Sequence, residues 1–574
     1  MMRLNIERCP HRSKALLLTL LILGLPLFSP SSFAVWSTSV DPDTGKAVVT
    51  KVSPTAKKEA ALTAAVAKKR EQRTGTDQDG YEPPSIDDNI EDVKVRTASE
   101  PGRESEEKEW SKLAKPEKAK LLKPFKNLSK ESATCASCHK NEHPGIYQQW
   151  GRSKHFGANV GCYECHKADK SDPDAVRHKD FIISVIVSPK DCGECHNVEA
   201  DQFEKSHHAK AAEIIGSLDN TLAEVVEGDM SFHGVSPVAV NGCWQCHGTE
   251  VKVLPNGELD PISWPNTGIG RINPDGSKGA CSACHQRHQF SAAQARRPEN
   301  CGKCHLGPDH PQKEIYDESK HGIGFYANVD KMNLDSAKWI AGEDYDAAPT
   351  CATCHMSATR NLPITHDVGD RISWTLRPPI SEKIDARDAK KGLIVKPWED
   401  RRKDMKDVCQ SCHGDKIIEN FYEQFDSLVN MYNNKYAIPA TKMMDLLLDE
   451  GLRTETPFDE EVEWNYYYMW HHEGRRARHG ASMQAPDYVQ WHGMYEVAHR
   501  FYMEWIPSVK EIIEKAEKDG NPEAAEKVKT FLDEKIMTLD GHAWFVGKTP
   551  PEIAKKRKAA RDAFKKRYLQ EIKK

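Results

Sequence analysis

The sequence predicts a mainly α-helical protein, in which short helices and loops wrap around bound groups and a helical domain follows at the C-terminus. The composition supports this prediction, because only 38% of the 574 residues are hydrophobic and the mean hydropathy is -0.69. Those values are low for a soluble chain long enough to form several domains. The same chain holds 17 cysteines. Something besides an apolar core must therefore organise the fold.

The charge excludes one broad class of partner. The chain has 81 basic and 86 acidic residues, so its formal net charge is -5. A nucleic-acid-binding protein normally shows a basic excess over one face or segment. We therefore expect no nucleic acid among the partners.

Residues 1–34 have the pattern of a secretory signal peptide. Basic side chains precede an apolar run from Ala15 to Phe28, and Ser32-Phe33-Ala34 offers small residues for cleavage. An uncleaved anchor is the alternative, but the run is shorter than the roughly 20 residues of a membrane span. We expect a mature chain that begins at Val35 and is exported to the periplasm or an equivalent extracytoplasmic compartment.

The cysteines form a repeat. The pattern Cys-x-x-Cys-His occurs eight times and uses every cysteine except Cys9, which lies in the signal peptide. The paired cysteines are Cys135 and Cys138, Cys162 and Cys165, Cys192 and Cys195, Cys243 and Cys246, Cys281 and Cys284, Cys301 and Cys304, Cys351 and Cys354, and Cys409 and Cys412. The histidines that follow them are His139, His166, His196, His247, His285, His305, His355 and His413.

This pattern is the attachment signature of c-type haem, whose vinyl groups bond to the two thiols while the adjacent histidine ligates the iron. A zinc ribbon does not need a histidine after every second cysteine, and thioredoxin-type redox pairs do not repeat eight times. The sequence thus predicts eight covalent haems, which supply the missing apolar mass. The segments between motifs are rich in Gly, Pro and Asp, so long strands are not expected there.

The rest of the chain gives the predicted domains. After His413 the apolar residues recur at helical spacing, first from Phe421 to Leu452, and Pro550 to Lys574 has the composition of a basic amphipathic helix with a solvated, subunit-packing or membrane-facing side. The predicted parts are a signal peptide (1–34), a charged and partly disordered lead-in (35–130), a multihaem domain (131–415) and a C-terminal helical domain used in oligomerisation (416–574).

One stretch carries a resemblance to a known family. Residues Cys281 to Ala293, read through the sixth motif to Asp309-His310 and Ser319-Lys320-His321-Gly322, are similar to the octahaem hydroxylamine oxidoreductase family, which includes hydrazine dehydrogenase. The resemblance runs from about Thr134 to Tyr502. It implies that the fourth haem, on Cys243 and Cys246 with His247, is five-coordinate and catalytic while seven haems relay electrons.

The resemblance also implies the remaining site residues. The distal ligands of the relay haems would be His155, His178, His208, His288, His321, His366 and His479. Histidine neighbours compete at two of these positions, His207 with His208, and His471 or His472 with His479. Asp309 and His310 would accept the protons that leave an N–H substrate with its electrons.

A tyrosine in this family cross-links to the catalytic haem of the neighbouring subunit. It aligns with Tyr488, although Tyr466, Tyr467, Tyr468 and Tyr495 lie nearby and the cluster could be a packing surface. The link implies a homotrimer. The segment 248–280 is longer than expected for the family and should form a loop near the catalytic haem.

The functional prediction is an enzyme that oxidises hydroxylamine or hydrazine and passes electrons to a small cytochrome. Two alternatives stay open: a reductive relative acting on nitrite or hydroxylamine, and a non-catalytic electron-transfer cytochrome. The latter requires every iron to be six-coordinate.

Overall fold

The computed structural model describes residues 128–214, 230–388 and 391–572, together with three two-residue strands near the N-terminus, β1 (Ser39–Val40), β2 (Ala47–Val48) and β3 (Arg96–Thr97). The chain divides into two compact units, residues 1–90 and 91–574. In the first unit β1 pairs with β2 in antiparallel fashion. The predicted signal peptide, and the lead-in apart from these strands and its last residues, lie outside the described residues.

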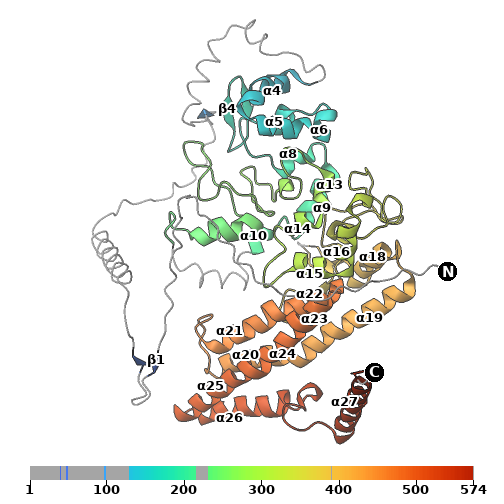
Figure 1. Ribbon diagram of the computed structural model, residues 1–574. Coiled ribbons are helices and arrows are strands. Elements are labelled where there is room, and N and C mark those ends of the chain that lie inside the picture. The colour runs from blue at the N-terminus through green and yellow to red at the C-terminus, as the bar shows by residue number, and fades with distance from the viewer. Residues whose placement is uncertain are drawn as a thin grey trace, which may run out of the picture. The chain divides into compact units, whose positions relative to one another are not determined.

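The motif-bearing part consists of short helices and loops (Figure 1). Its helices are α4 (Lys130–Glu142), α5 (Pro144–Gly151), α6 (Lys154–Gly157), α7 (Cys162–His166), α8 (Pro189–Gly193), α9 (Asn197–Lys205), α10 (Ala211–Ile214), η1 (Ala239–Cys243), α12 (Trp244–His247), η2 (Cys281–Ala283), α13 (Ala292–Ala295), α14 (Pro298–Cys301), α15 (Gln312–Glu318), α16 (Lys320–Ala327), η3 (Val329–Lys331) and α17 (Cys351–His355). Its strands are β4 (Val176–His178), β5 (Phe181–Ile183), β6 (Trp374–Thr375), β7 (Glu382–Lys383), β8 (Ala386–Arg387) and β9 (Ile394–Lys396).

The few strands form small local pairings. β4 pairs with β5 in antiparallel fashion and with β3 in parallel, while β6 pairs with β7 and β8 with β9. No described strand exceeds three residues. The expectation that long strands are missing between the motifs holds for the described residues.

Each motif folds as about one helical turn. In the third and fifth motifs the histidine N–H donates to the carbonyl of the first cysteine, His196 to Cys192 at 2.9 Å and His285 to Cys281 at 3.0 Å. Residues three apart lie on the same side of such a turn. Both thiols therefore emerge on one side, as attachment to one macrocycle requires.

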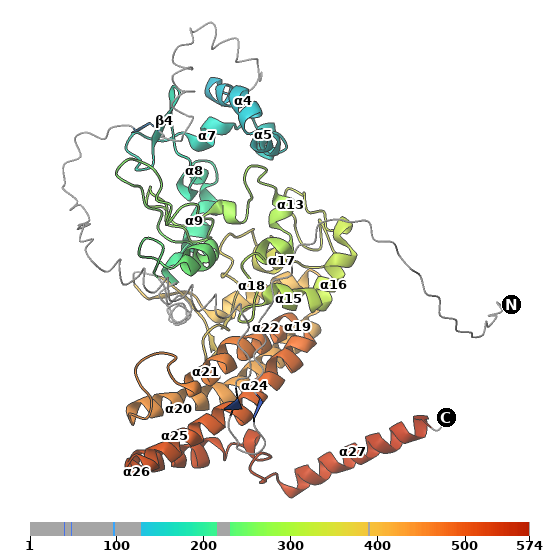
Figure 2. The same ribbon diagram turned by 60° about the vertical axis from the view of Figure 1, so that its left-hand side comes forward.

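The last motif starts at the end of one long helix, and further helices follow it; most of this group lie side by side in both views, but the final helix stands apart (Figures 1 and 2). They are α18 (Trp398–Gln410), α19 (Asp415–Tyr432), η4 (Asn433–Ala437), α20 (Ile438–Asp449), α21 (Glu461–Tyr467), η5 (Tyr468–Gly474), α22 (Arg475–Met483), α23 (Pro486–Val489), η6 (Gln490–Tyr495), α24 (Glu496–Arg500), η7 (Phe501–Trp505), α25 (Ile506–Lys518), α26 (Pro522–Thr530), η8 (Phe531–Ile536), η9 (Asp540–His542) and α27 (Pro551–Ile572). The largest apolar cluster among the described residues lies here and includes Tyr432, Met443, Phe501 and Trp505.

The predicted fold class is therefore confirmed: a mainly α-helical multihaem fold with a C-terminal helical region. The division predicted at residues 415 and 416 stays a prediction, although α19 begins directly after the last motif. The amphipathic helix predicted for residues 550–574 is wrong in one respect. A helix forms as α27, but its apolar residues are not gathered on one side, and the whole helix is exposed. None of the described helices is both long and apolar enough to cross a membrane.

Candidate haem and catalytic site

A continuous cavity runs through the motif-bearing part. Its volume is about 2280 Å³, and it is lined by all eight motif histidines and fourteen of the sixteen motif cysteines. The seven predicted distal histidines and His310 also line it. The structure thus brings almost the whole predicted haem-binding set to the wall of one cavity.

Five predicted distal histidines lie opposite a motif histidine. The ring centroids are 6.0 to 6.5 Å apart in every pair, as the following distances show: His139 and His178 6.1 Å, His155 and His196 6.1 Å, His166 and His288 6.4 Å, His285 and His366 6.4 Å, and His321 and His413 6.1 Å. Two imidazoles on opposite sides of one metal ion, with each nitrogen at about 2.0 Å, have centroids about 6 Å apart. The donor set and its spacing therefore fit bis-histidine haem.

The remaining two positions are those with competing neighbours. The ring of His208 lies 6.0 Å from that of His305, and its charge would also act on His355. His207 instead faces Arg377 and Asp367. The structure therefore favours His208 over His207 as an iron ligand.

His479 can likewise be compared with its competing neighbours, His471 and His472. Its side chain lines the cavity near His305 and His310, with Nε2 3.3 Å from the Gln312 amide nitrogen. Neither His471 nor His472 is among the described residues that line the cavity. The position of His479 supports it as the better candidate.

The second ring nitrogen of several motif histidines is already engaged. Nδ1 of His166 lies 2.8 Å from the Ser184 carbonyl oxygen, and Nδ1 of His355 lies 3.1 Å from that of Val368. A proton on Nδ1 leaves the Nε2 lone pair for the metal. Burial lowers the pKa of His285, His288 and His305 to about 4, which keeps these imidazoles neutral as iron ligation requires.

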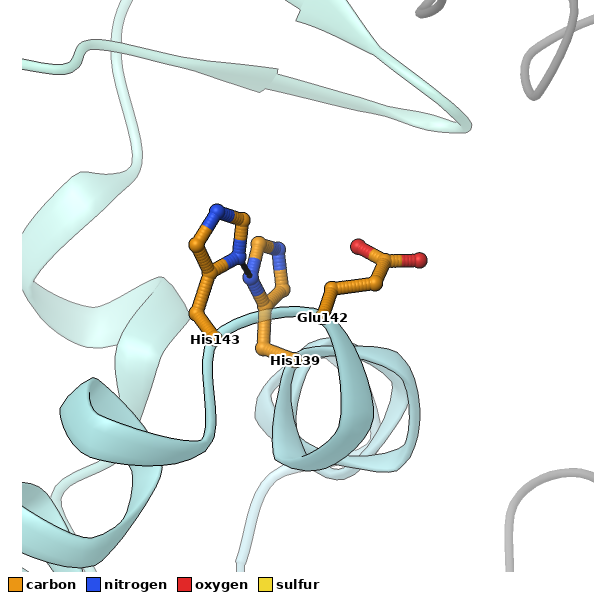
Figure 3. Close-up of side chains that lie close together, drawn as sticks. All are labelled: His139, Glu142 and His143. Carbon is orange, nitrogen blue, oxygen red and sulfur yellow. Dashed lines mark hydrogen bonds between the residues drawn. The ribbon is translucent and has the colours of Figure 1, made fainter.

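The first motif differs in the partner of its histidine. Nδ1 of His139 lies 2.9 Å from Nδ1 of His143, with Glu142 beside them (Figure 3). The three side chains could by themselves hold a metal ion. Because His139 belongs to a haem motif, we interpret His143 as its hydrogen-bond partner.

Contacts between thiols give the spatial order of the motifs. Three thiol pairs lie within hydrogen-bond reach, namely Cys192 with Cys281, Cys301 with Cys351, and Cys246 with Cys304. Four further pairs are close enough to interact electrostatically: Cys135 with Cys162, Cys165 with Cys192, Cys284 with Cys301, and Cys354 with Cys409. The motifs therefore follow one another in the order 1, 2, 3, 5, 6, 7, 8, and motif 4 joins this row at motif 6.

Comparisons with known proteins agree with this arrangement. Residues 273–457 match the family model described as "Seven times multi-haem cytochrome CxxCH", and residues 191–261 match that of "Cytochrome c554 and c-prime". A solved structure named "Hypothetical multiheme protein" is 27% identical, with a TM-score of 0.59 over 71% of this chain and 100% of its own. A reducing HAO-like protein complex from Kuenenia stuttgartiensis shares the fold at 20% identity, with a TM-score of 0.51 over 69% of this chain and 89% of its own.

A curated relative gives the family context. A probable nitrite reductase-hydroxylamine oxidoreductase fusion protein of Kuenenia stuttgartiensis is 26% identical over an aligned length of 331 residues, and the match covers 51% of this chain. The match spans 35% of that longer protein, about a third of its length. These comparisons support a resemblance of the chain to hydroxylamine-oxidoreductase-like multihaem cytochromes. Its Cys-x-x-Cys-His motifs accordingly bind c-type haems covalently.

The predicted proton acceptor lies at the cavity wall. His310 Nε2 is 3.5 Å from Asp309 Oδ2, and His310 Nδ1 is buried with no hydrogen-bond partner among the described residues. An imidazole that carries its proton on the nitrogen beside a carboxylate has its lone pair on the other nitrogen. His310 lines the haem cavity, and the carboxylate beside its ring makes the pair a candidate base at that wall.

The loop of residues 248–280 folds back on the fourth motif. The N–H of Ile269 donates to the Cys246 carbonyl at 2.9 Å, and the N–H of Gly270 donates to that of His247 at 3.1 Å. At Gly268 a Cβ atom would lie 2.0 Å from the Gly248 nitrogen, so only glycine permits this approach. The loop lies beside the predicted catalytic haem site, where we expected it.

Tyr488 lies on α23, outside the described wall of this chain's own cavity. Two exposed aromatic side chains, Trp491 and Tyr495, follow it on the same helical stretch. By contrast, Tyr467 is buried and its hydroxyl lies 3.0 Å from His471 Nε2. A tyrosine that serves a neighbouring subunit has to lie outside its own cavity, as Tyr488 does.

Sequence reasoning missed one residue of this site. Arg475 is 3% exposed, and its Nη1 lies 3.5 Å from Asp309 Oδ2. Its position 166 residues further along the chain gives no local pattern that connects it with Asp309. The only available signal was a cation in a helix that is otherwise largely buried.

Proposed function

We propose that this chain is an exported octahaem enzyme that oxidises hydroxylamine or hydrazine at a five-coordinate haem held by Cys243, Cys246 and His247. Electrons would pass through seven bis-histidine haems to a small cytochrome. The proposal rests mainly on one observation, the placement of His310 in the cavity wall with Asp309 at its Nε2. Export rests on the signal-peptide pattern.

The residues of the chain explain how protons would leave the substrate. A bound haem supplies an acceptor for electrons and a site for the substrate nitrogen. His310 would accept an N–H proton of the substrate, and Asp309 would stabilise the imidazolium that results. Without a base, the developing positive charge on the substrate would oppose the loss of further electrons.

The order of the motifs supplies the electron path. Cys246 of the fourth motif meets Cys304 of the sixth, so the sixth haem would receive electrons first. From there the row continues in two directions, toward the eighth motif and toward the first. This branching supports a relay that serves a central catalytic haem.

Tyr488 completes the proposal. We propose that it cross-links to the catalytic haem of a neighbouring subunit in a homotrimer and tunes that haem toward oxidation. Its place on an exposed aromatic stretch outside this chain's cavity supports that role.

The deciding experiment is steady-state turnover of the purified holoprotein. Hydroxylamine and hydrazine are each offered with an oxidised small cytochrome, nitrite is offered with a reduced electron donor, and the nitrogen products are identified. Oxidation of either N–H substrate supports the proposal. Turnover of nitrite alone contradicts it.

A reductive enzyme is the second candidate. It is favoured by the names of two similar proteins, a probable nitrite reductase-hydroxylamine oxidoreductase fusion and a reducing HAO-like complex. In that direction His310 would deliver protons to the bound substrate instead of removing them. An inert protein with only six-coordinate irons would instead be an electron-transfer cytochrome.

A further inference from the structure

A buried network extends from Asp309 into the C-terminal helices. Arg475 Nη1 lies 3.5 Å from Asp309 Oδ2 and 3.0 Å from His471 Nε2. Its Nε donates to the Arg377 carbonyl at 2.7 Å. The guanidinium is therefore held at three places, one of which is the carboxylate of the predicted proton-accepting pair.

His471 and Tyr467 form the outer part of this network. The Tyr467 hydroxyl lies 3.0 Å from His471 Nε2, and the two rings stack with centroids 4.2 Å apart. Arginine has no acceptor, so Arg475 must be the donor to His471 Nε2. His471 must therefore offer the Nε2 lone pair, and the ring accepts a hydrogen bond from Arg475.

The local helix geometry brings these side chains together. Tyr467, His471 and Arg475 follow at four-residue spacing, and the segment between the first and the last is the π-helix η5. Such wider helical segments are rare and are often found at functional sites. Here η5 brings the side chains of Tyr467, His471 and Arg475 into a row of contacts that ends at Asp309.

Arg475 cannot itself pass protons, because its guanidinium remains charged at any working pH. From its own buried position it can, however, compensate the charge of the half-buried Asp309 and fix the direction of the carboxylate. The oxygen that Arg475 approaches, Oδ2, is also the one nearest to His310 Nε2. Any movement of this carboxylate therefore also disturbs His310.

We infer that Arg475, supported by His471 and Tyr467, is a positioning residue that holds the Asp309 carboxylate opposite His310. The inference rests on the proposed function, in which His310 is the base. It assigns a purpose to a buried arginine and a π-helical segment that the haem-binding motifs do not explain.

The test is a double-mutant cycle. We compare three variants with the wild type: Arg475→Gln, Asp309→Asn and the double variant. Haem content and thermal unfolding are checked first, and kcat and KM are then measured for the N–H substrate that the protein oxidises. If Arg475 acts through Asp309, Arg475→Gln lowers kcat about 10- to 100-fold with little change in KM. In the Asp309→Asn background the same change costs less than about threefold, because the carboxylate is already gone. Equal losses in both backgrounds overturn the inference.

Two further variants distinguish a misplaced Asp309 carboxylate from a general loss of folding. Arg475→Lys keeps the charge and should recover part of kcat. Tyr467→Phe removes one donor to His471 while keeping the stacked ring, and should lower kcat less than Arg475→Gln does. The matched control is Arg402→Gln, which removes another buried arginine, one that pairs with Asp426 at 2.7 and 2.8 Å instead of with Asp309. The kcat per haem of Arg402→Gln should stay unchanged. If it falls as much as in Arg475→Gln, the loss reflects damage to the fold and not a displaced Asp309 carboxylate.

Cyanide binding gives a readout that does not depend on the direction of catalysis. Hydrogen cyanide must surrender its proton to ligate iron as the anion, so its association rate reports on the distal base. We expect Arg475→Gln to slow cyanide association in the wild-type background but not in Asp309→Asn. If the protein oxidises neither substrate but this pattern appears, the proposed oxidation fails while the role of Arg475 stands. Absence of cyanide binding in the wild type overturns both.

Discussion

Replacing His366 with alanine should convert one haem from six- to five-coordinate. The ring of His366 lies 6.4 Å from that of His285, with 28° between their planes, and its backbone N–H donates to Gln202 at 2.9 Å. This is the spacing of two imidazoles across one iron. Burial lowers the pKa of His366, so the neutral ring is ready to ligate. None of the other predicted distal histidines is paired with His285, so no second histidine should take the place of His366 on that iron.

The magnitude follows from the motif count. If all eight motifs carry haem, His366→Ala changes about one eighth of the iron from low spin to high spin. The exchangeable irons should rise from one to two per chain. Electron paramagnetic resonance of the oxidised protein measures the first quantity, and carbon monoxide titration of the reduced protein measures the second.

His207→Ala is the matched control, because His207 also lines the cavity but faces Arg377 and Asp367. It should leave both quantities unchanged. A His366→Ala protein whose spin distribution and carbon monoxide stoichiometry match those of the wild type would refute the pairing read from the ring geometry. A change after His207→Ala would show that the neighbouring histidine was assigned wrongly.

Four other outcomes are expected. Intact-mass measurement of the mature protein should show eight covalent haems and no free thiol, and six or fewer haems would contradict the motif count. Asp309→Asn or His310→Ala should slow oxidation of the N–H substrate by about 10²- to 10⁴-fold with haem content unchanged, and wild-type turnover would remove the pair from the mechanism. Denaturing electrophoresis should show bands above the monomer that persist under reducing conditions and vanish in Tyr488→Phe, whereas a native protein that runs only as monomer argues against the cross-link. Burial opposes ionisation of Asp426, but hydrogen bonds from Arg402, a lysine and a tryptophan lower its pKa to about 2. Since the unfolded value is about 3.9, its stabilising effect is present above about pH 4 and is lost as the pH falls toward 2, so the difference in thermal unfolding between wild type and Asp426→Asn should shrink over that range.

The haem attachment pattern could be predicted from the sequence because it is local. Two thiols and a histidine within five residues need only one turn of helix, which the structure provides at each motif. The distal ligands are different, since His285 and His366 meet only after the intervening chain has folded. Their spacing along the sequence differs from pair to pair, so only a family resemblance could suggest them.

Neighbouring histidines show the limit most clearly. His207 and His208 are the same residue type at adjacent positions, so their sequence surroundings are almost identical. In the structure the ring of His207 faces Arg377, whereas that of His208 faces His305. The basic C-terminal helix illustrates the opposite error. Its Lys and Arg content suggested a polar face, but at 3.6 residues per turn its apolar residues fall all round the helix, a property that the sequence itself contains.

The arrangement around the sixth motif links the two halves of the proposed chemistry. Cys304 meets the fourth motif at Cys246, and Asp309-His310 follows only a few residues later. One short segment therefore carries both the first electron acceptor beyond the catalytic haem and the base for the proton. Because Gln312 at the start of α15 lies 3.3 Å from His305 Nδ1 and Arg475 lies 3.5 Å from Asp309, both ends of this segment are held. If the proposed oxidation is right, proton and electron would leave the substrate toward groups that are a few covalent bonds apart, and a shift of the segment that weakened one transfer would weaken the other as well.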